Sequence, residues 1–233
     1  GGGGVTGDEA SPQTARLLDP SSMVLDAQNR ILVATREPTP PSQYVVRRFD
    51  LASGSVEMLV GHTQHGPAGP LSATSLPLST DLAVIDASTL VAVTRTIALQ
   101  AVRLEEGLVE TVMGHAMRSP ALQYPVLARS RSFYPVEAVE WDAAAGRLYV
   151  SALRRLFVVT ALNDAAGIVL NDESRWTVEA LSAAPNTSYG GEGALAIESS
   201  IAGASSMYFD PTARVLYVAD TGRIRAIHMG PLG

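Results

Sequence analysis

One order of short apolar runs occurs four times along the chain, and this recurrence limits the possible folds more than any other feature. The first run of each repeat closes on an aspartate, at Asp26, Asp86, Asp142 and Asp210. The intervals are 60, 56 and 68 residues (86 − 26, 142 − 86 and 210 − 142). Short runs rich in Val, Leu, Ile and Tyr, separated by turn residues, are typical of β-strands. The pattern predicts an all-β chain, a β-propeller of four-stranded antiparallel blades.

The repeats divide residues 1–233 into about four blades of a single propeller domain or segment. The predicted blades cover residues 7–62, 63–115, 116–183 and 184–233, and the last is incomplete because it has three runs where the others have four. The unequal intervals indicate loops of variable length on a constant core. The first run of each blade is expected to be its innermost strand. Residues 23–25 and 82–85 suit burial on both faces.

The last repeat contains the most specific motif. It has Tyr-Gly-Gly-Glu-Gly-Ala-Leu-Ala at 189–196, then Met-Tyr-Phe-Asp at 207–210 and Val-Leu-Tyr-Val-Ala-Asp-Thr-Gly at 215–222. These segments resemble the NHL-repeat family of β-propellers. The earlier repeats have Ala-Thr at 34–35, Val-Thr at 93–94 and Ser-Ala at 151–152 where that family usually has Ala-Asp. NHL propellers usually close with about six blades, so the resemblance implies a larger ring. Sequence outside this chain, or another copy, would then complete it.

Two absences in the composition exclude several classes of chemistry. All 17 basic residues are arginine, and lysine and cysteine are both absent. The chain therefore has no Walker A lysine, Schiff-base lysine, thiolate nucleophile, disulfide or cysteine metal site. A formal charge of −6 disfavours nucleic-acid binding. The sequence contains no run of about 18 uncharged apolar residues, so it predicts no membrane span. The absence of cysteine leaves the cellular location open.

Three histidines form the one candidate metal site of the sequence. Gly-His pairs end equivalent runs at His62 and His115, 53 residues apart (115 − 62), and His65 follows at His-x-x-His spacing. Three imidazoles could bind zinc, as in the peptidyl-hydroxyglycine lyases that resemble NHL propellers. The simpler interpretation is a polar exit from each strand, duplicated with the repeat. We assign no metal and no cofactor.

The repeated aspartates have a local explanation. An aspartate that ends a strand can accept hydrogen bonds from backbone N–H groups of the turn that follows. Glu137 and Glu140 have no counterparts in the other repeats, so they are the better candidates for a pocket. The glycines at 190, 191 and 193 predict a turn, because no strand precedes them as in a nucleotide-binding fingerprint. No nucleophile elbow or zinc-protease helix is present, and no catalytic residue is assigned.

Loops are where a propeller presents functional residues. The stretch after Arg36 contains Pro38, Pro40 and Pro41, and stiff extended segments of this kind suit peptide docking. With the adjacent arginines Arg154 and Arg155, these residues are the candidate interaction surface. The favoured interpretation is a non-catalytic scaffold that binds a protein or peptide partner through loops and blade faces. The alternative is a metal-dependent lyase or lactone hydrolase acting at the central channel.

Overall fold

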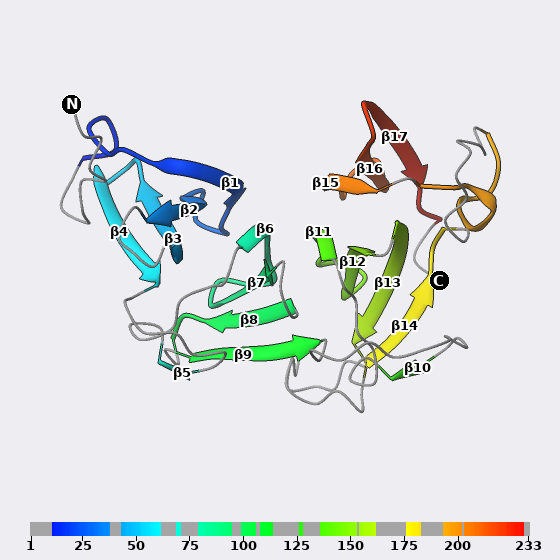
Figure 1. The fold of residues 1–233 in the computed structure, drawn as a ribbon, viewed down its shortest axis with the longest axis horizontal. Helices are drawn as coiled ribbons and strands as arrows, with labels where there is room; N and C mark the ends of the chain where they lie inside the picture. Colours follow the sequence, from blue (N-terminus) through cyan, green and yellow to red (C-terminus); the bar gives the residue numbers. More distant parts are fainter. Residues whose placement is uncertain are drawn as a thin grey trace. The chain divides into compact units, whose positions relative to one another are not determined.

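The structure is a computed structural model of residues 1–233. It describes residues 11–37, 43–61, 69–70, 79–94, 99–105, 108–113, 126–127, 136–152, 154–161, 176–182, 193–201 and 203–230. These residues form antiparallel β-strands, apart from one short 3₁₀ helix, η4 (Ala196–Glu198). Figure 1 shows the strands gathered into separate sheets. The all-β prediction is confirmed.

The described strands form four sheets, each built mainly from strands that follow one another in the chain (Figure 1). The N-terminal sheet has the order β1-β2-β3-β4: β1 (Leu18–Leu25), β2 (Ile31–Glu37), β3 (Gln43–Asp50) and β4 (Ser55–Val60). The second sheet has the order β5-β9-β8-β7-β6: β5 (Gly69–Pro70), β6 (Ser79–Val84), β7 (Thr89–Thr94), β8 (Leu99–Arg103) and β9 (Leu108–Met113).

The third sheet has the order β10-β14-β13-β12-β11: β10 (Val126–Leu127), β11 (Val136–Asp142), β12 (Arg147–Ala152), β13 (Arg155–Ala161) and β14 (Trp176–Ala180). The C-terminal sheet has the order β15-β16-β17: β15 (Ala204–Asp210), β16 (Val215–Asp220) and β17 (Arg223–His228). Within the described chain, this last sheet has three strands. The blade boundaries drawn from the sequence stay a prediction.

The contacts divide the chain into two compact units. The first contains Gly1–Arg95 and Gln100–Thr111, and the second contains Thr96–Leu99 and Val112–Gly233. The N-terminal and second sheets pack together in the first unit, where β1 lies beside β6. The third and C-terminal sheets pack together in the second unit, where β11 lies beside β15. Each unit is thus a pair of neighbouring blades.

A β-bulge near the start of the first strand aligns the repeats residue by residue. The register shifts between Leu18 and Ser22, between Ser79 and Asp81, between Val136 and Ala138, and between Ala204 and Ser206. The pairs that follow the bulge are Ser22↔Ala34, Asp81↔Val93, Ala138↔Ser151 and Ser206↔Ala219. These pairs are equivalent, because a bulge fixes both register and facing in a strand pair. In this alignment, Asp26, Asp142 and Asp210 coincide, whereas Asp86 lies one residue later.

The aspartates at the strand ends accept hydrogen bonds from turn backbone, as the sequence predicts. Asp26 Oδ1 accepts from the N–H groups of Gln28 and Arg30, both at 2.9 Å. Asp86 Oδ1 accepts from Ser88 N–H at 2.8 Å, Asp142 Oδ1 from Ala145 N–H at 3.1 Å, and Asp210 Oδ1 from Thr212 and Ala213 N–H at 2.8 and 2.9 Å. These bonds lie in tight turns between antiparallel strands, so each carboxylate stabilises a hairpin.

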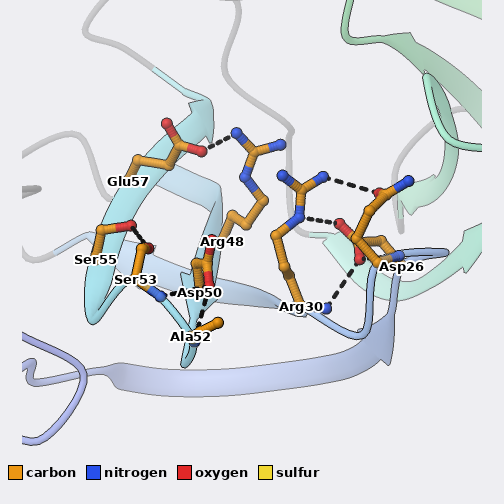
Figure 2. A network of polar contacts seen from close by, with 9 residues as sticks. Asp26, Arg30, Arg48, Asp50, Ala52, Ser53, Ser55 and Glu57 are labelled. Atoms are coloured by element: carbon orange, nitrogen blue, oxygen red, sulfur yellow. Dashed lines mark hydrogen bonds and ion pairs between the residues drawn. The ribbon is translucent and has the colours of Figure 1, made fainter.

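Figure 2 shows this turn chemistry in the N-terminal sheet. Asp50, at the end of β3, accepts from Ala52 and Ser53 N–H at 2.9 and 3.0 Å, so a third-strand aspartate uses the same mechanism. Backbone hydrogen bonds to its carboxylate lower the pKa of Asp50 below its usual value, with the Ser53 N–H as the main cause. Arg48 forms an ion pair with Glu57 across the same hairpin.

Alternating apolar side chains form the core of each unit. In the first unit, Leu32, Ala34 and Val46 pack against a set from the second sheet: Leu82, Leu90, Ala92, Val102 and Val109. In the second unit, Ala138, Tyr149 and Leu156 pack against Met207, Phe209, Leu216 and Val218. The period of two places these residues on the faces that meet, because successive side chains of a strand point to opposite faces.

One burial prediction is wrong for the first strand. Met23 and Leu25 were expected to be buried on both faces with Val24 between them, but they are 68 % and 59 % exposed. Val24 points to the opposite face and packs against the core of the first unit. The face of Met23 and Leu25 has only a small cluster, Val33, Phe49 and Val56, partly covered by Ala15 and Leu17. Among the described residues of its unit, no other sheet packs on this face.

Candidate functional site

The metal and proline-loop candidates lie outside the described residues. This applies to His62, His65 and His115, and to Pro38, Pro40 and Pro41. The zinc hypothesis and the proline-loop hypothesis therefore stay predictions. In the part of the chain that the structure describes, no group of three or more His, Asp or Glu side chains is placed to hold a metal ion.

The three arginines of the candidate interaction surface are in different settings. Arg36, on β2, has its Nη1 atom 3.4 Å from Asp19 Oδ2, and the two side chains are 41 % and 61 % exposed. An exposed pair of this kind contributes at most about 1 kcal/mol. Arg154 is exposed in the tight turn between β12 and β13, where its φ is +60°, and Arg155 begins β13 and is partly buried. The structure brings Arg154 and Arg155 together as sequence neighbours only.

Glu137 is a partly buried carboxylate at the start of the third sheet. It lies at the bulge of β11, between Val136 and Ala138, and is partly buried. The Ser151 hydroxyl donates to Glu137 Oε2 at 3.2 Å and accepts from Ala204 N–H at 3.3 Å. A Cβ atom added to Gly203 would lie 3.3 Å from Glu137 Oε2, so the glycine backbone passes close to the carboxylate. The side chain therefore links β11 and β12 to the start of β15.

Burial raises the pKa of Glu137 above its usual value. The nearby Asp220 carboxylate acts in the same direction, whereas the Ser151 hydrogen bond and the Arg154 charge oppose the shift. A carboxyl group that is hard to ionise holds its proton to higher pH, which is the property a general acid needs. Glu137 is a described glutamate whose pKa is raised by burial, which bears on its protonation and not on its surroundings as a site.

Glu140 has a structural role, so the two glutamates singled out together in the sequence differ in function. Its Oε1 atom accepts from the backbone N–H of Phe209 at 3.1 Å. Phe209 lies on β15, the first strand of its sheet, and β15 runs beside β11. The carboxylate therefore satisfies an N–H group at the edge of the C-terminal sheet, which backbone pairing within that sheet does not reach.

A buried ion pair joins the two sheets of the second unit, and sequence reasoning missed it. Arg214 Nη1 donates to Asp142 Oδ2 at 2.7 Å, and the Asp142 side chain is 0 % exposed. The Arg214 guanidinium lies 5.0 Å from the centroid of the Phe209 ring. The Tyr149 hydroxyl lies 3.4 Å from Asp142 Oδ2. Burial, with the Asp142 charge second, raises the pKa of Tyr149 to about 12.

The residue that ends the turn after each repeat's first strand is the sequence signal that could have indicated this pair. In the four-residue turn after Asp142, the last position is Gly146 with φ +60°, and the equivalent position after Asp210 is Arg214 with φ +54°. Positive φ disfavours a long side chain, so glycine is the usual choice there. An arginine where another repeat has glycine indicates that a favourable side-chain contact offsets the backbone strain of positive φ, and here that contact is the ion pair with Asp142.

Asp220 gives the Ala-Asp motif of the last repeat a structural setting. The carboxylate is buried, with its Oδ2 atom 3.7 Å from Arg225 Nη1. Arg225 also donates to Ser200 O at 2.6 Å and so anchors the segment after η4 to the C-terminal sheet. The equivalent residue of the first repeat, Thr35, is buried as well and donates to Leu18 O at 2.6 Å. The position is therefore polar and bonded in both repeats.

An aromatic and aliphatic surface lies on one face of the C-terminal sheet. Tyr208 and Tyr217 are a cross-strand pair whose rings stack at 6.4 Å between centroids. They are 60 % and 37 % exposed, and Ile224, on the same face of β17, is 78 % exposed. We call Tyr208, Tyr217 and Ile224 the tyrosine face. The opposite face of this sheet, with Met207, Phe209 and Val218, is buried in the core of the second unit.

No protein-family model matches the sequence, and no curated protein matches it. Solved structures do match in fold. The structure described as a nidogen/laminin complex has a TM-score of 0.52 at 11 % identity, over 91 % of this chain and 61 % of that one. An auxiliary nutrient binding protein from Bacteroides ovatus has a TM-score of 0.51 at 11 % identity, over 91 % and 48 %.

The chain thus spans about half to three fifths of these two proteins. At such low identity, the likeness shows the fold alone. With the four antiparallel sheets, it identifies the fold as a β-propeller, as the repeat pattern predicts. Among the described residues, no helix is long and apolar enough to cross a membrane.

Proposed function

We propose that this chain is a β-propeller platform of the NHL type, which binds a protein partner through blade faces and loops. The observation that carries the proposal is the tyrosine face. Large apolar side chains clustered on a surface, above all aromatic ones, are the residues that contribute most to protein–protein interfaces. Tyrosine suits this role because its ring buries a large area while its hydroxyl group stays paired with water or a partner.

The roles of the acidic side chains also support a platform. Asp26, Asp86, Asp142 and Asp210 hold turns, and Glu140 caps an edge N–H group. Carboxylates that stabilise the scaffold in this way are not free for acid–base work. The names of two structural neighbours, a nidogen/laminin complex and a nutrient binding protein, also describe binding.

Affinity capture with a matched pair of variants tests the proposal. The chain is immobilised as wild type, as the double variant Tyr208→Ser/Ile224→Ser, and as a control variant Leu195→Ser. Leu195 is 68 % exposed and lies in the same unit, next to η4 and outside the tyrosine face. We expect proteins from an extract of the source cells to be retained by the wild type and the control and lost by the double variant. Identical retained sets for all three would refute the proposal.

The propeller enzyme is the second candidate, and Glu137 is the observation that favours it. Burial raises its pKa, and a carboxyl group that holds its proton to higher pH than usual could serve as the acid of a lactone hydrolase or lyase. Glu137→Gln keeps the shape and removes the ionisable group. If the enzyme hypothesis is correct, the wild type should hydrolyse members of a panel of lactones, with or without zinc, and this variant should not. Equal rates in both proteins, or none in the wild type, would exclude it.

A further inference from the structure

Each pair of sheets meets through two different faces, which we name by their place in the chain order. The trailing face of a sheet packs on the sheet that follows, and the leading face packs on the sheet that precedes. In the N-terminal sheet, the trailing face includes Leu32 and Val46, both 0 % exposed against the second sheet. In the third sheet, it includes Tyr149 and Leu156, also 0 % exposed against the C-terminal sheet.

The tyrosine face is the trailing face of the C-terminal sheet. The pairs Ala34↔Val46, Ser151↔Leu156 and Ala219↔Ile224 are equivalent, because each contains the residue paired just after the bulge. Ile224 thus corresponds to Val46 and Leu156. Two residues earlier on the second strand, Tyr217 corresponds to Leu32 and Tyr149. Positions that are fully buried in two sheets are therefore exposed in the C-terminal sheet, where Ile224 is 78 % exposed.

The leading face of the N-terminal sheet is open in the same way. Counted from the bulge, Met23 corresponds to Leu82 in the second sheet and to Met207 in the C-terminal sheet. Leu82 and Met207 are 1 % and 7 % exposed because each packs on the preceding sheet, whereas Met23 is 68 % exposed. Leu25 corresponds to Phe209 and is 59 % exposed, against 4 % for Phe209.

We propose that two copies of this chain associate head to tail, with the trailing face of the C-terminal sheet of one copy packed on the leading face of the N-terminal sheet of the other. In the described residues, the N-terminal sheet has an open leading face and the C-terminal sheet an open trailing face, and these match the two halves of the contact seen within each unit. A heterologous contact of this type joins different surfaces of identical chains. The proposal rests on the proposed function and names the partner of the tyrosine face as a second copy.

Sedimentation velocity and light scattering over about 1 to 100 μM test the proposal with four proteins. These are the wild type, Ile224→Glu on the trailing face, Met23→Glu on the leading face, and Leu51→Glu as a control. Leu51 is 63 % exposed in the turn after β3. We expect the wild type and the control to reach at least twice the mass of one chain. Each face variant should weaken association at least about tenfold, because a charge enters an apolar contact.

A mixture of the two face variants gives the sharpest result. Ile224→Glu keeps an intact leading face and Met23→Glu keeps an intact trailing face, so their equimolar mixture should form a heterodimer. The double variant should stay monomeric when mixed with itself. Circular dichroism and the melting temperature verify that each variant is folded. A monomeric wild type over the whole range would overturn the proposal, and so would two folded face variants that do not associate when mixed.

These outcomes are separable from failure of the proposed function. If the wild type is monomeric but still captures proteins that the tyrosine-face variant loses, the platform proposal stands and self-association fails. If the wild type associates head to tail and captures no other protein, self-association stands and binding of a different partner fails.

Discussion

Replacing Arg214 by alanine tests whether the buried ion pair with Asp142 holds the C-terminal sheet on the third sheet. The two residues are 72 apart in the sequence: Asp142 ends β11 of the third sheet, and Arg214 lies in the turn between β15 and β16 of the C-terminal sheet. Asp142 is 0 % exposed and Arg214 is 18 % exposed, with 2.7 Å between the bonded atoms. Removal of the guanidinium leaves a buried carboxylate with the Ala145 N–H at 3.1 Å and the Tyr149 hydroxyl at 3.4 Å. Neither partner carries a positive charge.

The expected loss in the free energy of unfolding is about 3 kcal/mol. Breaking a buried ion pair by removing one partner costs about 3–5 kcal/mol, because the remaining charge is uncompensated. Arg214 is partly exposed, so water can reach the vacated space and the loss should fall at the lower end of that range. The contact of the guanidinium with the Phe209 ring contributes about 0.5–1 kcal/mol of this total.

Urea denaturation followed by tryptophan fluorescence measures this loss in the second unit, which contains the ion pair. The chain has two tryptophans, and both lie in the third sheet, Trp141 on β11 and Trp176 on β14. Their emission therefore reports unfolding of the sheet that holds Asp142. The matched control is Arg48→Ala, whose partner Glu57 is 49 % exposed. Loss of that surface pair should cost less than about 1 kcal/mol.

A second variant separates the loss of the pair from a general loss of packing. Asp142→Asn combined with Arg214→Met removes both charges and keeps much of the side-chain volume. It should recover at least about 1 kcal/mol relative to Arg214→Ala, because no buried charge is left. The reasoning is refuted if Arg214→Ala costs no more than Arg48→Ala, or if the double variant is less stable than Arg214→Ala.

Three further predictions concern single residues. Gly61→Ala should lower the free energy of unfolding by at least about 2 kcal/mol, measured by thermal melting, because φ is +127° and the new methyl group would overlap Val45. Gly54→Ala is the control: its φ is +72° and the space around it is open, so it should cost about 1 kcal/mol. Asp210→Ala should cost about 1 kcal/mol through loss of two turn bonds, and a loss below about 0.3 kcal/mol would contradict the turn role. The pKa of Glu137 is raised in the folded chain, so the folded state keeps that proton to higher pH than the unfolded state does. The free energy of unfolding should therefore fall as the pH rises from the unfolded pKa to the folded pKa of this group. Glu137→Gln should flatten this fall in urea titrations carried upward in pH from the usual pKa of a glutamate, and an unchanged slope would contradict it.

Strand positions and turn chemistry could be predicted from the sequence because they depend on local physics. The alternation of apolar residues and the recurring aspartates gave the sheets and the carboxylate turns, which the structure confirms at Asp26, Asp86, Asp142 and Asp210. The register of Asp86, one residue later than its counterparts, could not be predicted. It depends on the hairpin length after β6, which pairing between strands decides.

The candidate site could be predicted only in part. Glu137 and Glu140 are three residues apart, so a regular strand would place them on opposite faces, but that spacing does not say which neighbours each side chain meets. The structure does, because Glu140 meets the Phe209 N–H, 69 residues later in the chain, while Glu137 is partly buried beside Ser151. Long-range packing of this kind has no local signature in a single sequence.

The sequence by itself determined the all-β class, the main strands and the four repeats, since each depends on side chains that are close along the chain, whereas the short fifth strands β5 and β10 appear only in the structure. Only the tertiary structure decided which faces are covered. Met23 and Leu82 are both large, apolar and equivalent in the repeat, yet one is 68 % and the other 1 % exposed. The physical reason is that burial of a sheet face requires a neighbouring sheet, and the presence of that neighbour is a property of the packed units, not of the residue.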